Sequence, residues 1–192
     1  MFKLSKDLII FDVETSGSDT RTACIIQLGA VKMHKNGELC LQPSFELNVI
    51  PYTDTWEKEA EKIHGLSKAD LMRTGYRRVE VLKNFEEWAG DPKKFYLAQW
   101  SCGFDTDMLR GAYESTLAMK YPYSHRVFDV ASIVRFYLAT KGKLASKCGE
   151  AECAKRLGIP VDKSQCHDAL YDATLSGQML EKIIREERKG KV

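Results

Sequence analysis

A chain of 192 residues is long enough to bury one hydrophobic core. Hydrophobic residues make up 44% and charged residues 29%, and no apolar run approaches the roughly 18 residues of a membrane-spanning helix. The net charge of +2 excludes a nucleic-acid clamp that works through bulk positive charge, but not an enzyme whose bound cations supply charge locally. We expect one domain over residues 1–185, a polar tail over 186–192, no membrane association and a cytoplasmic location.

The first third of the chain predicts three antiparallel strands. Residues 7–13 form an apolar run that ends in turn-forming residues at 16–19. Residues 25–34 are rich in strand formers, and Asn36-Gly37 is a strong signal for a hairpin turn into a third strand over 39–49.

From Trp56 onward the pattern is mainly helical, with two further strands. Val79, Leu82, Phe85 and Trp88 mark one apolar helix stripe, and Gly158 ends another helix. The predicted elements are helices over 56–63, 68–74, 79–88, 105–113, 144–157 and 169–187, a strand over 94–100, and a short strand running into a helix within 127–138. This order predicts an α/β fold with a mixed five-stranded sheet flanked by helices.

Two acidic residues end the first strand. Asp12 and Glu14 are two residues apart, so their carboxylates point to the same side of the strand. A shared cation would remove their repulsion, whereas the alternative is a frayed strand end with both acids in solvent. The apolar run before Asp12 favours a buried strand, where an unpaired acid is unusual.

Three more acids and one histidine stand at the starts of two helices. Asp105 opens the helix over 105–113, where it is a candidate metal ligand or simply the N-cap, and Asp107 belongs on the outer face. His167 lies in the loop before the last helix, and Asp172 lies in its first turns. We expect Asp168 to be the N-cap, and His167 to be either a functional imidazole or an ordinary surface histidine.

The cysteines offer a weaker metal hypothesis. Cys148, Cys153, Cys166 and His167 form C-x4-C-x12-C-H, whose gaps fit a structural zinc site poorly. Cys148 and Cys153 are five apart in the predicted helix and would not share a face. We expect buried free thiols at all six positions, which are Cys24, Cys40, Cys102, Cys148, Cys153 and Cys166.

Taken together, these segments resemble a known family. D-x-E-T-S-G at 12–17, F-D at 104–105 and H-D-A-x-x-D-A at 167–173 resemble the three motifs of the DEDDh 3′–5′ exonucleases, a group with an RNase H-like fold that includes the proofreading epsilon subunit and ribonuclease T. I-H-G-L-S at 63–67 and V-L-K-N-F-E-E-W-A-G-D at 81–91 are also similar, so the resemblance covers roughly residues 8–180.

The resemblance implies a reaction and a set of roles. Asp12, Glu14, Asp105 and Asp172 would bind two Mg²⁺ or Mn²⁺ ions, with Asp12 bridging them, and His167 would accept the proton of the attacking water. Backbone amides around Thr15 and Ser16 would meet the terminal 3′-hydroxyl, and His64 and Phe104 would contact the last nucleotide. The product would be a nucleoside 5′-monophosphate released from a single-stranded 3′ end.

The sequence leaves the substrate and partners open. Trp100-Ser101 stands where many relatives have His-Asn, which is reminiscent of the RNA-processing branch, and Trp100 is either core or a base-stacking residue. DNA and RNA are both candidate substrates, and a polymerase or another nucleic-acid-processing protein is a candidate partner. The alternative function is a catalytically silent nucleic-acid-binding or docking module with the same fold.

Overall fold

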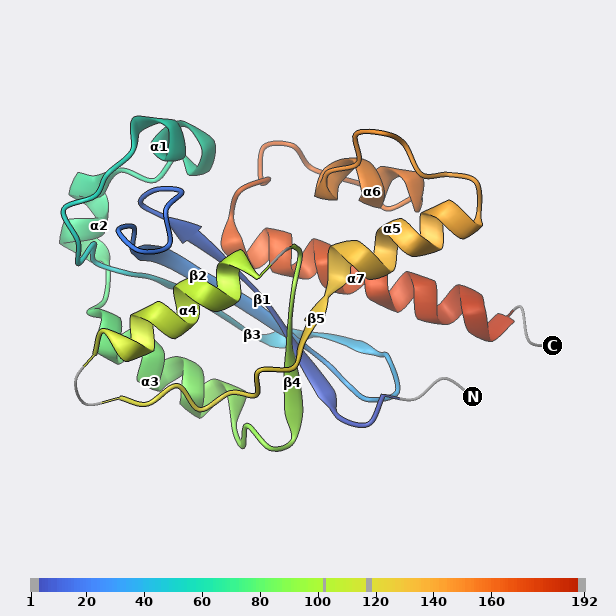
Figure 1. Ribbon diagram of the computed structural model, residues 1–192, viewed down its shortest axis with the longest axis horizontal. Helices are drawn as coiled ribbons and strands as arrows, with labels where there is room; N and C mark the ends of the chain where they lie inside the picture. The colour runs from blue at the N-terminus through green and yellow to red at the C-terminus, as the bar shows by residue number, and fades with distance from the viewer. Residues whose placement is uncertain (1–3, 102, 117–118, 190–192) are drawn as a thin grey trace.

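The computed structural model describes residues 4–101, 103–116 and 119–189, and it places one sheet between two groups of helices (Figure 1). The strands are β1 (Asp7–Thr15), β2 (Ile25–Met33), β3 (Leu39–Asn48), β4 (Phe95–Gln99) and β5 (Val127–Asp129). The helices are α1 (Lys58–His64), α2 (Lys68–Thr74), α3 (Arg78–Ala89), α4 (Phe104–Glu114), α5 (Val130–Thr140), α6 (Glu150–Arg156) and α7 (Ala169–Lys189).

The sheet has the strand order β3-β2-β1-β4-β5, with β1 in the middle. β1, β2 and β3 pair as antiparallel neighbours, whereas β4 runs parallel to β1 and β5 runs parallel to β4. The β2–β3 turn at Asn36-Gly37 is closed by a hydrogen bond from the His34 N–H to the Glu38 carbonyl, at 2.9 Å. The predicted meander and the predicted mixed five-stranded sheet are therefore confirmed.

Residues of β1 alternate between two hydrophobic cores. The odd-numbered residues of 9–13 pack with α3 and α4, whereas Leu8 and Ile10 pack with α5, α6 and α7. Asp12 and Glu14 continue the even-numbered series. The register of β1 therefore directs both carboxylates toward the side of the sheet that α7 covers.

The apolar face of α3 differs from the predicted stripe. Val79 and Trp88 are only half-buried, although Phe85 is fully buried with its ring centroid 5.2 Å from that of Phe45. The buried residues of α3 are Val81, Leu82, Phe85 and Ala89. A strict spacing of three drifts around a helix of 3.6 residues per turn, so the ends of the predicted stripe rotate out of the core.

The helix predicted over 144–157 begins only at Glu150. The Arg135 guanidinium binds the carbonyl of Cys148, at 3.2 Å, which gives that carbonyl a partner outside any helix. Cys148 consequently lies in a loop, and its Sγ is 2.7 Å from the Sγ of Cys153. The prediction that these two cysteines face apart was wrong, because it assumed that both were helical.

No zinc site built on cysteine occurs in the part of the chain that the structure describes, where the one candidate ligand group contains no thiol. Cys24, Cys148 and Cys153 are buried as predicted, whereas Cys40 and Cys166 are partly exposed. Cys102 lies outside the described residues. Of the helices described, none has the length and hydropathy needed to cross a bilayer.

Candidate active site

Gln27 fastens the start of α7 to the sheet. Gln27 pairs with Glu14 across β1 and β2, and its side-chain Oε1 accepts a hydrogen bond from the Ala169 N–H, at 3.0 Å. Its Nε2 donates to Asp168 Oδ2, at 3.4 Å. The first turn of α7 is thereby held beside the acid-bearing end of β1.

Gly29 allows α7 to approach closely. It pairs with Asp12, and a Cβ at this position would lie 2.2 Å from the Leu170 nitrogen and 2.3 Å from the Ala169 carbonyl carbon. Any side chain would collide with helix backbone, which cannot swing aside as a flexible side chain can. Gly29 and Gln27 are positioning residues that the sequence analysis did not identify, and the long-range contacts that define them leave no local sequence signal.

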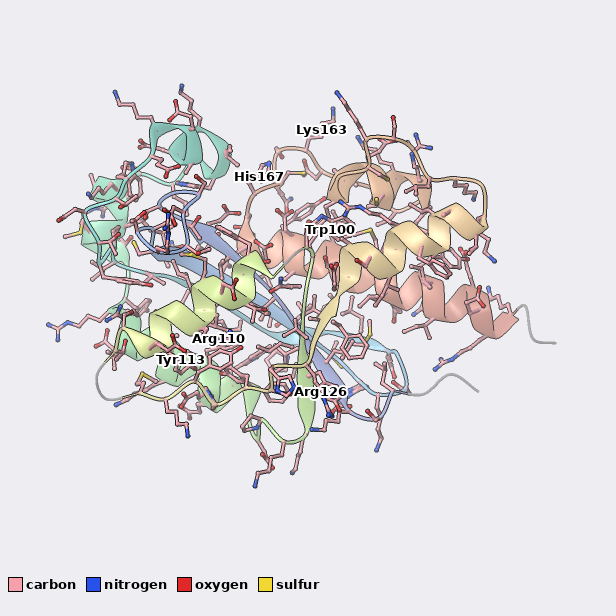
Figure 2. The ribbon with its side chains drawn as sticks, viewed as in Figure 1. Trp100, Arg110, Tyr113, Arg126, Lys163 and His167 are labelled. Atoms are coloured by element: carbon pink, nitrogen blue, oxygen red, sulfur yellow. The ribbon has the colours of Figure 1, made fainter. Side chains whose placement is uncertain are left out.

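His167 and Asp172 meet at the N-terminal end of α7. Asp168 Oδ1 accepts the Tyr171 N–H at 2.9 Å, so Asp168 is the N-cap as predicted. The N–H of His167 donates to Asp172 Oδ2, at 3.0 Å, and His167 has a left-handed backbone with φ of 68°. His167 is exposed at the end of the loop that leads into α7 (Figure 2).

Asp105 reaches the cluster from the start of α4. Gly103, with φ of 84°, is the N-cap, so the N-cap alternative for Asp105 is wrong. Asp105 is 7% exposed; burial raises the pKa of its carboxyl to about 7, and bonds from its own N–H and that of Val13 oppose this rise in pKa. Asp107 is exposed and lies 3.9 Å from Arg110, as expected for an outer-face acid.

The acids and His167 converge without a cationic partner. One ligand atom each from Glu14, His167 and Asp172 can be chosen so that all lie within 4.8 Å of one another. Within the described residues, no salt bridge includes Asp12, Glu14, Asp105 or Asp172. The donor set consists mainly of carboxylate oxygens, which suit hard divalent cations such as Mg²⁺ and Mn²⁺.

Burial and mutual repulsion favour the protonated form of these acids. Burial raises the pKa of Asp12 well above its usual value, with the charges of Asp105 and Glu14 adding to the rise. Burial, followed by the charge of Asp172, raises the pKa of Glu14 to about 8. The pKa of Asp172 is also raised, mainly by burial. Shared cations would reverse this preference by compensating the carboxylate charges.

A cavity of about 460 Å³ adjoins the acids and is lined by Glu14, Thr15, His64 and Phe104. His64 Nδ1 accepts the Leu66 N–H at 2.9 Å, so Nε2 carries the proton whenever the ring is neutral. That Nε2 is buried without a hydrogen-bond partner among the described residues. Three of the four predicted substrate-binding residues, Thr15, His64 and Phe104, therefore share one cavity.

Ser16 is the exception among the predicted substrate-binding residues. It is 1% exposed, and its N–H donates to the Cys24 carbonyl at 2.9 Å. Its hydroxyl accepts the Cys24 N–H, also at 2.9 Å. Its amide is therefore already bonded inside the protein, and Ser16 does not line the cavity, so its contact with a 3′-hydroxyl stays a prediction.

Comparison with known proteins identifies the family. A family model for exonucleases of the RNase T type matches residues 9–180. The chain belongs to this exonuclease family. The PolC-type DNA polymerase III of Staphylococcus epidermidis is 30% identical over 183 residues, and that of Oceanobacillus iheyensis is 27% identical over 188. These matches cover 94% and 92% of this chain but only 12% and 11% of the polymerases.

Solved structures share the exonuclease fold. Cell-death related nuclease 4 (CRN-4) has a TM-score of 0.78 at 17% identity, covering 94% of this chain and 64% of that one. The nuclease domain of 3′hExo, a DEDDh family member bound to rAMP, has a TM-score of 0.75 at 16% identity, with coverage of 94% and 92%. E. coli ExoI in complex with single-stranded DNA has a TM-score of 0.79 at 15% identity, and the match covers 95% of this chain and 41% of that one. The predicted RNase H-like fold is confirmed.

Trp100 lies at the end of β4 in this exonuclease fold (Figure 2). It is half-buried against the core formed with α5, α6 and α7. The Arg135 guanidinium lies 5.6 Å from its ring centroid. These contacts favour the core role of Trp100 over base stacking.

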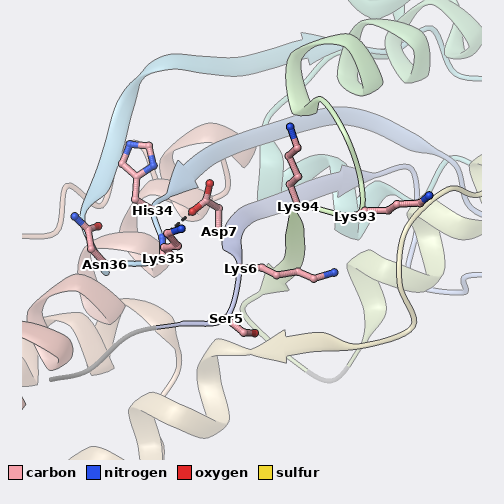
Figure 3. A pocket seen from close by; sticks show the side chains of 8 residues that line it. All are labelled: Ser5, Lys6, Asp7, His34, Lys35, Asn36, Lys93 and Lys94. Atoms are coloured by element: carbon pink, nitrogen blue, oxygen red, sulfur yellow. Dashed lines mark hydrogen bonds between the residues drawn. The ribbon is translucent and has the colours of Figure 1, made fainter.

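A larger hollow, of about 650 Å³, lies where β1 begins, at the other end of the strand from the acids (Figure 3). Four lysines line it, namely Lys6, Lys35, Lys93 and Lys94. Its one acid, Asp7, accepts the Lys35 N–H at 2.7 Å. This lining repels divalent cations, so the only end of β1 suited to metal chemistry is the one that carries Asp12 and Glu14.

Proposed function

We propose that this chain is a divalent-metal-dependent 3′–5′ exonuclease that releases nucleoside 5′-monophosphates from single-stranded DNA or RNA. The observation that carries the proposal is the convergence of Asp12, Glu14, Asp105 and Asp172 from three distant segments, beside a cavity. Glu14 and Asp105 are buried, Asp12 and Asp172 are partly buried, and no salt bridge among the described residues includes any of the four. A protein with no use for cations would gain stability by replacing some of these acids.

In the proposed reaction the four carboxylates hold two Mg²⁺ or Mn²⁺ ions. When bound, these ions lower the pKa of a water nucleophile and stabilise the leaving 3′-oxygen. Asp12 lies on the central strand of the sheet, and the charges of each of the other three acids raise its pKa, so it would be the carboxylate shared by both ions.

His167 would accept the proton of the attacking water. Its backbone N–H is held by Asp172, which keeps the residue next to the acids, while its side chain remains accessible to solvent. An imidazole that reaches solvent can take up this proton and pass it on to bulk water.

The cavity lined by Thr15, His64 and Phe104 would receive the terminal nucleotide. The unpartnered Nε2–H of His64 can donate to a sugar or phosphate oxygen, and burial lowers the pKa of this histidine, so the ring is neutral at physiological pH. Phe104 offers an aromatic face to a base, a contact that tolerates any sequence.

Two observations bear on substrates and partners. E. coli ExoI binds single-stranded DNA and the 3′hExo nuclease domain binds rAMP, which supports testing both kinds of nucleic acid. The similarity to one segment of PolC-type polymerases supports a polymerase, or another nucleic-acid-processing protein, as partner.

The test is digestion of single- and double-stranded DNA and RNA with Mg²⁺ or Mn²⁺. A 3′ label should be released as a mononucleotide, and a 5′ label should give a ladder that shortens with time. Asp105→Asn should abolish digestion without unfolding the protein. Asp107→Asn is the matched control, because Asp107 is exposed on the same helix, and it should retain wild-type activity.

Failure to digest any of these substrates with either metal would refute the proposal. Binding to single strands that persists unchanged in EDTA, with no turnover, would instead support the silent binding module.

A further inference from the structure

Glu150 brings a fifth carboxylate toward the acid cluster. It is the first residue of α6, and its Oε1 accepts a hydrogen bond from the Ser176 hydroxyl, at 2.7 Å. Ser176 is 1% exposed and follows Asp172 by four residues on α7. Residues four apart share a helix face and are about 6 Å from each other along the axis. Ser176 therefore holds the Glu150 carboxylate one helical turn from Asp172.

A hollow of about 340 Å³ joins Glu150 to the candidate active site, because Asp172 and His167 line it as well. Within the described residues, no salt bridge neutralises Glu150. One hydroxyl bond is weak compensation for a carboxylate that is partly shielded from water and lies among like charges. A purely structural link between α6 and α7 could be made by an uncharged side chain.

Glu150 interacts electrostatically with other acids of the cluster. Burial first, and then the charges of Asp172 and Asp105, raise its pKa to about 8, and its own charge contributes to the raised pKa of Asp12. For Glu14 the rise in pKa comes from burial and then from Asp172, Asp105 and Asp168. The charge of Glu150 is therefore felt by acids of the candidate metal centre, as its place in the same hollow as Asp172 leads one to expect.

We propose that Glu150 is an additional carboxylate of the metal centre and serves one of its two cations. This inference rests on the proposed function. The Glu150 oxygen that Ser176 does not hold would contact this ion directly or through one water. Divalent cations such as Mg²⁺ require about six oxygen ligands, and an ion held by few carboxylates gains affinity from each one added. Ser176 acts as a positioning residue.

The test is Mn²⁺ binding to the whole chain by titration calorimetry, without nucleic acid, comparing wild type with Glu150→Gln. Glutamine keeps the side-chain length and an oxygen that accepts the Ser176 hydroxyl, so the change removes little besides the charge. We expect the affinity for one of the two Mn²⁺ ions to fall by about tenfold or more, because that ion loses a carboxylate ligand. The affinity for the other Mn²⁺ ion should change by less than about twofold.

Glu152→Gln is the matched control. Glu152 is on the same helix and lines the same hollow, but its charge is paired with Arg156, at 2.7 Å, so both Mn²⁺ affinities should match wild type. Ser176→Ala should weaken the same ion as Glu150→Gln does, but by a smaller factor. Thermal melts of the metal-free variants establish that each one folds.

Wild-type affinity for both ions in folded Glu150→Gln would overturn the inference and leave Glu150 as a structural acid. Equal weakening of both ions would also overturn it, because the effect would then be general electrostatics. The inference about Glu150 and the proposed function can fail independently of each other. If wild type binds two Mn²⁺ ions, and Glu150→Gln loses one of them, but no nucleic acid is digested, the inference stands and the proposed function falls.

Discussion

Glu14→Gln should stabilise the metal-free protein, and the gain should grow with pH. Burial, followed by the charge of Asp172, raises the pKa of Glu14 from 4.5 to about 8 in the folded state. The native state therefore binds more protons than the unfolded chain, so this carboxyl contributes stability below its unfolded pKa and loses it as pH rises toward 8. Glutamine removes that pH-dependent loss.

The size of the effect follows from the two pKa values. One pH unit between them corresponds to about 1.4 kcal/mol. At pH 7, which is about 2.5 units above 4.5, holding Glu14 protonated in the fold costs up to about 3 kcal/mol relative to its ionised form in the unfolded chain. At pH 5 the same relation gives about 1 kcal/mol. The substitution should recover these amounts.

Urea unfolding in EDTA between pH 5 and pH 8 measures the gain. Glu87→Gln, at an exposed position on α3, is the control and should change stability by less than about 0.5 kcal/mol throughout. Added Mn²⁺ should reverse the order, because ions that bind only the folded protein stabilise wild type more than the variant. A gain that is equal at pH 5 and pH 8, or a less stable variant in EDTA, would refute the reasoning.

Two further predictions test how α7 is placed. Gly29→Ala should destabilise the protein by about 1–3 kcal/mol in thermal melts and lower nuclease activity sharply, because its Cβ would meet the Leu170 nitrogen. The control is Gly111→Ala, which has open space around it in α4 and should be at least as stable as wild type. Equal stability of the two variants would contradict this placement of α7. Asp168→Ala should lower stability by about 1 kcal/mol through loss of the helix cap yet retain cleavage, whereas a loss of activity as complete as in Asp172→Asn would assign Asp168 to the reaction.

Patterns that act over a few residues were readable from the sequence. Strand alternation places Asp12 and Glu14 on one side of β1, and the cap at Asp168 fixes where α7 begins. The hairpin at Asn36-Gly37 makes β2 and β3 antiparallel neighbours. These features depend on local backbone geometry and helix or strand period, which the order of residues encodes directly.

Contacts between distant residues required the tertiary structure. Ser16 turned out to have its amide bonded to Cys24, and α3 buries a face rotated from the predicted stripe. Glu150 was not a candidate site residue, because the predicted helix over 144–157 placed it in the interior of a helix and not at the start of one.

The sequence alone determined the chemistry-bearing residues and the strand and helix ends on which they stand. Only the tertiary structure decided how they meet. Gln27 accepts a hydrogen bond from the start of α7, 142 residues away in the sequence, and Ser176 donates one to Glu150, 26 residues away. The physical reason is that a hydrogen bond or close approach between distant segments depends on how whole elements pack, and no local period records which partner a side chain finds.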